Sequence, residues 1–168
     1  MPDSSDQRYT IVVVDDNPEL LELLEEGLAS QFTIIAAQDG VEGLTTIVEA
    51  HPDCAVIDVK MPGLDGLQVA RALRGDTATS DIPLIILTAL PEEQGLLPSL
   101  FSGADRYLTK PVLPSELILS IHEVIAISQA ERVRQLRLLV KQSGEDEERA
   151  SDEATASAES AKKGVFRS

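Results

Sequence analysis

Between residues 9 and 142 the chain alternates short apolar runs with longer segments in which apolar side chains recur every three or four residues. Four of the five runs are aliphatic or β-branched with few polar positions, a pattern typical of strands buried on both faces of a parallel sheet. We therefore expect five strands, at residues 9–14, 33–37, 54–57, 84–88 and 106–109.

The segments between these runs carry helix signals. Asn17 suits the N-cap and Pro18 the first turn of a helix, and the leucines that follow form one stripe: Leu20, Leu21, Leu24 and Leu28. Asp39 suits the N-cap of a second helix, and a third is expected over residues 67–74. This order of elements predicts an α/β fold, a doubly wound parallel five-stranded sheet with helices on both faces.

The last two expected helices depart from the ordinary pattern. The fourth is weak, because Gly95 and Pro98 fall where a helix interior should be, and proline there costs about 3 kcal/mol. The fifth is long, because no proline or glycine interrupts residues 115–142. About 28 residues rise roughly 40 Å, so we expect its second half to project, to pack on a partner or to fray.

Changes in composition divide the chain into four parts. Residues 1–8 are polar, and we expect a flexible N-terminus; residues 9–127 hold the folded domain, and 128–142 extend its fifth helix. Residues 143–168 are rich in Ala, Ser and Glu and poor in large apolar side chains. Such a segment buries too little surface to offset its ordering entropy, so we expect a disordered acidic tail.

Charge and cysteine content narrow the function classes. The chain has 29 acidic and 14 basic residues, a formal charge of −15, which disfavours direct binding to nucleic acid or to an anionic membrane surface. A single cysteine, Cys54, excludes an internal disulfide. No apolar run approaches the roughly 20 residues that span a bilayer, and the N-terminus does not resemble a signal peptide. We expect a cytoplasmic protein.

Polar side chains gather at the carboxyl ends of the expected strands, where open parallel sheets bind ligands. They are Asp15 and Asp16 after the first strand, Asp58 after the third, Thr88 at the end of the fourth and Lys110 after the fifth. Three carboxylates in one pocket repel one another, and a hard divalent cation relieves that repulsion. With an ammonium and a hydroxyl beside them, they predict a site for a phosphoryl group.

These residues lie in motifs that resemble the receiver domain of bacterial two-component response regulators. The motifs are VVVDDNPE, VIDVKMPGLDG, LIILTA and GADRYLTKP, and the similarity covers residues 9–127. The resemblance implies a flavodoxin-like fold and a phosphoprotein of a phosphorelay, with Asp58 as the phosphoacceptor. It further implies that Asp16, Asp58 and the backbone carbonyl of Lys60 hold Mg²⁺ or Mn²⁺, with Asp15 acting largely through bound water.

The same resemblance assigns the remaining positions. Lys110 would pair with a phosphoryl oxygen and Thr88 would donate to another, while Tyr107 stands at the switch-aromatic position. The bond from Lys110 to Pro111 would be cis. Leu90, two residues beyond Thr88, cannot hydrogen-bond an attacking water, so we expect slow self-dephosphorylation. Such a protein is a phosphoacceptor that catalyses its own modification rather than a conventional enzyme.

We expect a stand-alone receiver that takes its phosphoryl group from a sensor histidine kinase or a phosphotransfer protein. It would signal to a downstream protein, which the sequence does not identify, through a changed docking surface.

Two other functions remain as alternatives. The first is a dimerisation or interaction module built on the fifth helix, where Val133, Leu136 and Val140 follow three-four spacing near the cations Arg132, Arg134, Arg137 and Lys141. The second is a small-molecule binder on the same fold, which the acidic pocket argues against.

Overall fold

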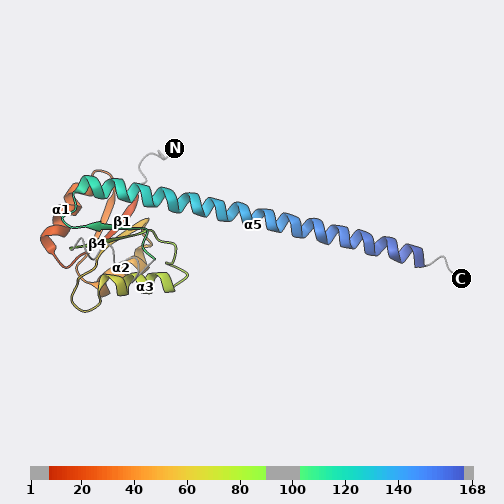
Figure 1. The fold of residues 1–168 in the computed structure, drawn as a ribbon, viewed down its shortest axis with the longest axis horizontal. Coiled ribbons are helices and arrows are strands. Elements are labelled where there is room, and N and C mark those ends of the chain that lie inside the picture. The colour runs from red at the N-terminus through yellow and green to blue at the C-terminus, as the bar shows by residue number, and fades with distance from the viewer. Residues whose placement is uncertain (1–7, 90–102, 165–168) are drawn as a thin grey trace. The chain divides into compact units, whose positions relative to one another are not determined.

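The computed structural model describes residues 8–89 and 103–164 (Figure 1). The chain divides into two compact units, Met1–Ser128 and Gln129–Ser168. The first unit contains one parallel sheet with strand order β2-β1-β3-β4-β5. Its strands are β1 (Thr10–Val14), β2 (Thr33–Ala37), β3 (Cys54–Asp58), β4 (Leu84–Thr88) and β5 (Arg106–Thr109). The order confirms the predicted doubly wound sheet.

Helices cover both faces of this sheet (Figure 1). They are α1 (Pro18–Leu28), α2 (Gly40–Ala50), α3 (Gly66–Gly75) and α5 (Pro114–Gly164). Alternate side chains of the strands point to opposite faces, so each central strand contributes to two cores. Ile11 and Val56 pack with α1 and the first turns of α5, whereas Val12 and Ile57 pack with α2 and α3. All three central strands are thus buried on both sides, as their continuous apolar sequences indicated.

The local signals at the helix starts work as expected. Asn17 caps α1 by accepting hydrogen bonds from the backbone N–H groups of Glu19 and Leu20, at 3.0 and 3.3 Å. Asp39 caps α2 by accepting from the N–H of Glu42 at 2.8 Å. These side-chain acceptors satisfy donors that have no partner inside the helix.

The start of α3 contains a capping box that the sequence analysis did not identify. The Asp65 carboxylate accepts from the Gln68 N–H at 2.9 Å, and the Gln68 side-chain oxygen accepts from the Asp65 N–H at the same distance. Two backbone donors are satisfied reciprocally, and this fixes where the chain leaves the loop after β3.

The last two expected helices have different outcomes. The weak fourth helix, with Gly95 and Pro98, lies outside the described residues. The α5 helix extends to Gly164, whereas we expected helix to 142 and disorder over 143–168. The backbone of this segment is helical because Ala and Glu are strong helix formers, and residues 143–163 contain one glycine, Gly144, and no proline. Within the described part of the chain, no helix is long and apolar enough to cross a membrane.

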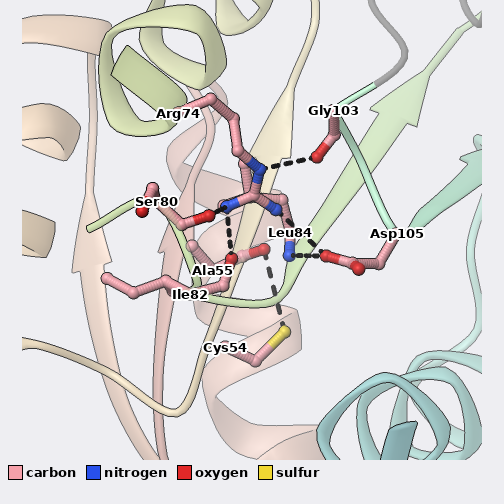
Figure 2. A network of polar contacts seen from close by, with 8 residues as sticks. All are labelled: Cys54, Ala55, Arg74, Ser80, Ile82, Leu84, Gly103 and Asp105. Carbon is pink, nitrogen blue, oxygen red and sulfur yellow. Dashed lines mark hydrogen bonds and ion pairs between the residues drawn. The ribbon is translucent and has the colours of Figure 1, made fainter. Parts of the chain in front are cut away.

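A polar network links α3 to the segments at the amino ends of the strands (Figure 2). The Arg74 guanidinium, at the end of α3, donates to the carbonyls of Gly103, Ser80 and Ile82 at 2.7, 2.9 and 2.7 Å. It also pairs with Asp105 at 3.1 Å. The Asp105 carboxylate in turn accepts from the Leu84 N–H at 2.8 Å. One side chain therefore joins α3 to the beginnings of β4 and β5.

Candidate functional site

The strand order creates the site. β1 lies between β2 and β3, so the chain turns to opposite sides of the sheet after β1 and after β3, and a crevice opens between their carboxyl ends. Asp15 directly follows β1, and Asp58 is the last residue of β3. The register pairs Val14 with Ile57, so these two aspartates leave neighbouring strands at the same level.

Three carboxylates converge in this crevice. One oxygen from each of Asp15, Asp16 and Asp58 lies within 4.8 Å of the others. Asp15 is fully buried and Asp58 is 4% exposed, whereas Asp16 is exposed. The cluster therefore has a buried floor and one side open to solvent.

Lys110 lies against the two buried members. Its ammonium nitrogen is 2.6 Å from Oδ2 of Asp15 and 3.0 Å from Oδ1 of Asp58. The Lys110–Pro111 peptide bond is cis, as the resemblance implied. The Lys110 backbone N–H donates to the carbonyl of Thr88 at 2.7 Å, which ties the loop carrying the lysine to the end of β4.

Asp15 is fixed from two sides. While Oδ2 pairs with the lysine, Oδ1 accepts a hydrogen bond from the backbone N–H of Asn17 at 2.9 Å. Asn17 thus has a second role besides capping α1. The sequence analysis did not assign that role, although an aspartate two residues before an N-cap is a usual setting for such a turn.

The pKa values of both Asp58 and Lys110 are raised, which favours the neutral form of the aspartate and the charged form of the lysine. Burial raises the pKa of Asp58, as do the charges of Asp15 and Asp16, while its hydrogen bond to Lys110 works against that rise. Burial by itself would lower the pKa of Lys110, but its contacts with Asp15 and Asp58 outweigh burial and raise the pKa. The lysine therefore stays charged and the buried aspartate carries an unfavourable negative charge.

Of the remaining predicted residues, the structure describes Thr88, Tyr107 and Lys60. Thr88 is the last residue of β4 and is fully buried. Tyr107 lies on β5 opposite Ile86 and packs, partly buried, against the core on the α2–α3 face; burial raises its pKa. Lys60 is exposed in the loop after β3. Leu90 lies outside the described residues.

Gly66 holds the loop after β3 in place. A Cβ atom at this position would lie 2.0 Å from the backbone oxygen of Asp58, so only glycine allows α3 to start directly against the end of β3. Its N–H also donates to the carbonyl of Val59 at 3.0 Å. This close approach to Asp58 is visible only in the structure.

The donor set fits a hard divalent cation. Mg²⁺ prefers oxygen ligands and is usually held by one or two carboxylates together with water. Asp16 and Asp58 offer such oxygens beside a solvent-open side, and the excess of negative charge in the cluster favours a cation. Lys110 neutralises only part of that charge, because it brings one positive charge to three carboxylates.

The fold and the site define a class of protein, and comparison with known proteins agrees. The chain matches the family described as "Response regulator receiver domain" over residues 11–122. It belongs to this family, and it is the receiver of a two-component system.

Solved structures show the same fold. A chain described as a response regulator of Chloroflexus aurantiacus is 30% identical, with a TM-score of 0.66, over 71% of this chain and 99% of that one. A receiver domain protein of Methanospirillum hungatei, described as CheY-like, is 26% identical with a TM-score of 0.67, over 74% and 98% of the two chains.

Among curated proteins, the similarity is confined to a short segment. The phosphate regulon transcriptional regulatory protein PhoB of Pseudomonas aeruginosa is 46% identical over 56 residues, which is 33% of this chain and 24% of PhoB. PhoB of Escherichia coli K12 is 43% identical over 53 residues, 32% and 23% of the two chains. The matched part thus spans about a quarter of these relatives.

Proposed function

We propose that this chain accepts a phosphoryl group on Asp58 from a phosphohistidine, in a reaction that depends on Mg²⁺ or Mn²⁺. One observation carries the proposal: three carboxylates and Lys110 converge at the carboxyl ends of β1 and β3. Within this group Asp58 belongs to the strand itself and is buried, whereas Asp16 is exposed and Asp15 has both oxygens occupied.

The chemistry assigns a part to each side chain. A carboxylate oxygen of Asp58 attacks phosphorus while the bond from phosphorus to the imidazole nitrogen breaks, and the imidazole leaves. Lys110, now 3.0 Å from Asp58, pairs with an oxygen of the transferred group, and the Thr88 hydroxyl donates to another. Positioning and charge stabilisation supply most of the catalysis in such transfers.

The proposed metal ligands are Asp16, Asp58 and the backbone carbonyl of Lys60, with Asp15 linked through water. When bound, Mg²⁺ offsets the negative charge that develops on the phosphoryl oxygens. Asp15, held by Lys110 and by the backbone of Asn17, keeps the floor of the site rigid.

The proposed donor is a sensor histidine kinase or a histidine phosphotransfer protein. The receiver then signals by changing a docking surface as Thr88 and Tyr107 move, and we propose that the phosphoryl group is lost slowly. The named relatives are transcriptional regulators. Because the match covers about a quarter of their length, we do not infer the downstream partner of this chain from them. Action without an attached output domain stays a prediction, which the size of the native protein on an immunoblot tests.

The experiment is intact mass spectrometry after incubation with Mg²⁺ and phosphoramidate. We expect a gain of about 80 Da in the wild type, none in Asp58→Asn, and loss of the adduct when a chelator is added first. Asp81→Asn is the matched control, because Asp81 is exposed and precedes β4 at the opposite end of the sheet. An adduct that persists in Asp58→Asn would contradict the assignment.

A further inference from the structure

Residues 129–164, the described part of the second unit, form one helix that exposes large apolar side chains. Val133, Leu136 and Leu138 are 48%, 62% and 52% exposed. Val133 and Leu136 line a shallow groove of about 350 Å³ together with Arg137 and Lys141. Helices in water are stabilised mainly by packing an apolar face against something else, so this face requires a partner.

The apolar positions form a stripe that changes in size along the helix. Val133 and Leu136 are followed in the sequence by Val140, at three-four spacing. Three heptads after the first two come Ala154 and Ser157, which therefore lie on the same stripe and are also exposed. The side chains of the stripe are therefore large at its beginning and small towards its end.

Charge changes along the helix in the same direction. Residues 131–141 contain four basic residues and one acidic residue, whereas residues 145–153 contain six acidic residues and one basic residue. Among them, Arg137, Lys141, Asp152 and Glu153 are exposed. A single helix therefore carries a basic half with large apolar side chains and an acidic half with small ones.

We propose that two copies of this chain associate through this helix in antiparallel orientation. A parallel pair would place basic against basic and acidic against acidic. With the stripes aligned, the antiparallel pair places residues 131–141, which hold four basic residues and one acidic residue, against residues 149–159 of the other copy, which hold three acidic residues and one basic residue. It also places the large side chains opposite the small ones. In heptad register, Val133 lies opposite Ser157 of the partner subunit, and Leu136 lies opposite Ala154 of the partner subunit. The occupant of the groove is thus a second copy, because the same sequence supplies both complementary halves.

This association goes beyond the phosphoacceptor function and does not depend on it. The test is light scattering of the full chain across a concentration series, with the wild type compared to a variant in which Arg132, Arg134, Arg137 and Lys141 are replaced by Glu. We expect a wild-type dimer and a monomeric variant, since both halves of the variant are acidic. A wild-type monomer at the highest soluble concentration overturns the proposal. An unchanged dimer in the variant overturns the antiparallel orientation.

Two further measurements test the charge pairing. A second variant replaces Asp152, Glu153 and Glu159, which belong to the segment opposite the basic residues, by Lys. We expect it to be monomeric alone but to form a mixed dimer with the first variant. Salt should weaken the wild-type dimer, because screening removes an attraction. Association that strengthens with salt, or variants that fail to combine, would contradict the pairing.

The stripe itself is tested with matched leucines. Leu136→Gln should raise the dimer dissociation constant about tenfold or more, whereas Leu138→Gln should leave it unchanged, because Leu138 is similarly exposed but points away from the stripe. Equal effects of the two substitutions would overturn the proposal. Asp58→Asn should retain the dimer, which separates this inference from the phosphoryl chemistry.

Discussion

At the scale of single residues, the negative charge of Asp58 destabilises the folded protein when no metal is bound. Its carboxylate is buried and shares the crevice with Asp15 and Asp16, and burial and these charges raise its pKa above the ordinary 3.8. A carboxyl with a raised pKa favours the folded state while protonated, and this contribution is lost as pH rises through the raised pKa. The charge cluster therefore lowers stability at neutral pH.

We predict that Asp58→Asn stabilises the protein in the presence of a chelator. At neutral pH the free energy of unfolding should rise on the order of 1 kcal/mol, because one of three close charges is gone. The difference from wild type should shrink as pH falls below the raised pKa and vanish below 3.8. Urea denaturation at several pH values checks this.

Two results bear on that prediction. Addition of Mg²⁺ should reduce or reverse the advantage of the variant, because the wild type binds the cation better. A variant that is less stable than wild type at neutral pH without metal would show that the contact between Asp58 and Lys110 outweighs burial and repulsion.

The local sequence pattern predicted the residues at the strand ends, but it did not predict the contacts between residues far apart in the chain. Asp15, Asp16, Asp58 and Lys110 follow runs of strand residues, so their meeting place follows from the parallel order. The contacts of Arg74 with Gly103 and Asp105 join residues about thirty positions apart. An arginine in the last turn of a helix has a sufficient local explanation in the helix dipole, so the sequence carried no signal for this network.

At the scale of elements, α3 begins in direct contact with the backbone at the end of β3. We predict that Gly66→Ala lowers the free energy of unfolding by about 1–3 kcal/mol or more, because its Cβ would meet the Asp58 carbonyl oxygen at 2.0 Å. Phosphorylation by phosphoramidate should fall as well, because Asp58 must shift. Chemical denaturation and intact mass measure the two effects.

Gly75→Ala is the matched control on the same helix. A Cβ at Gly75 meets nothing within 4 Å, so the substitution should be neutral or stabilise by about 0.4–1 kcal/mol through the unfolded state. Similar losses in both variants would mean that helix α3 tolerates no alanine at its ends and that the contact with Asp58 is not the cause.

The elements themselves were largely predictable because burial and capping are local. β2, β4 and β5 coincide with the expected runs, and β3 is one residue longer because Asp58 continues the strand. The extent of α5 was not predictable in the same way. Low apolar content argued for disorder after 142, while Ala and Glu favour helix, and sequence alone does not decide which of these opposing tendencies prevails.

At the scale of the whole first unit, Arg74 adds polar contacts between α3 and the beginnings of β4 and β5, elements that also share a hydrophobic core. We predict that Arg74→Met lowers the free energy of unfolding by about 2–4 kcal/mol, because three carbonyls and the Asp105 carboxylate lose a charged donor (Figure 2). Thermal and urea denaturation measure this. Arg71→Met, on the exposed side of the same helix, should change stability by no more than about 0.5 kcal/mol. If both variants lost the same free energy of unfolding, the cause would be the removal of a positive charge from α3 and not the loss of these contacts.

The one cysteine of the chain has a practical consequence for following its movements. Cys54 is fully buried at the start of β3, and burial, together with the nearby charges of Asp105 and Asp53, raises the pKa of its thiol. The thiolate is the reactive form, so Cys54 should not react with thiol-labelling reagents in the folded protein. The natural sequence therefore serves as a cysteine-free background. A single cysteine introduced at any exposed position can carry a spin label or a fluorophore, so distance changes can be recorded during treatment with Mg²⁺ and phosphoramidate.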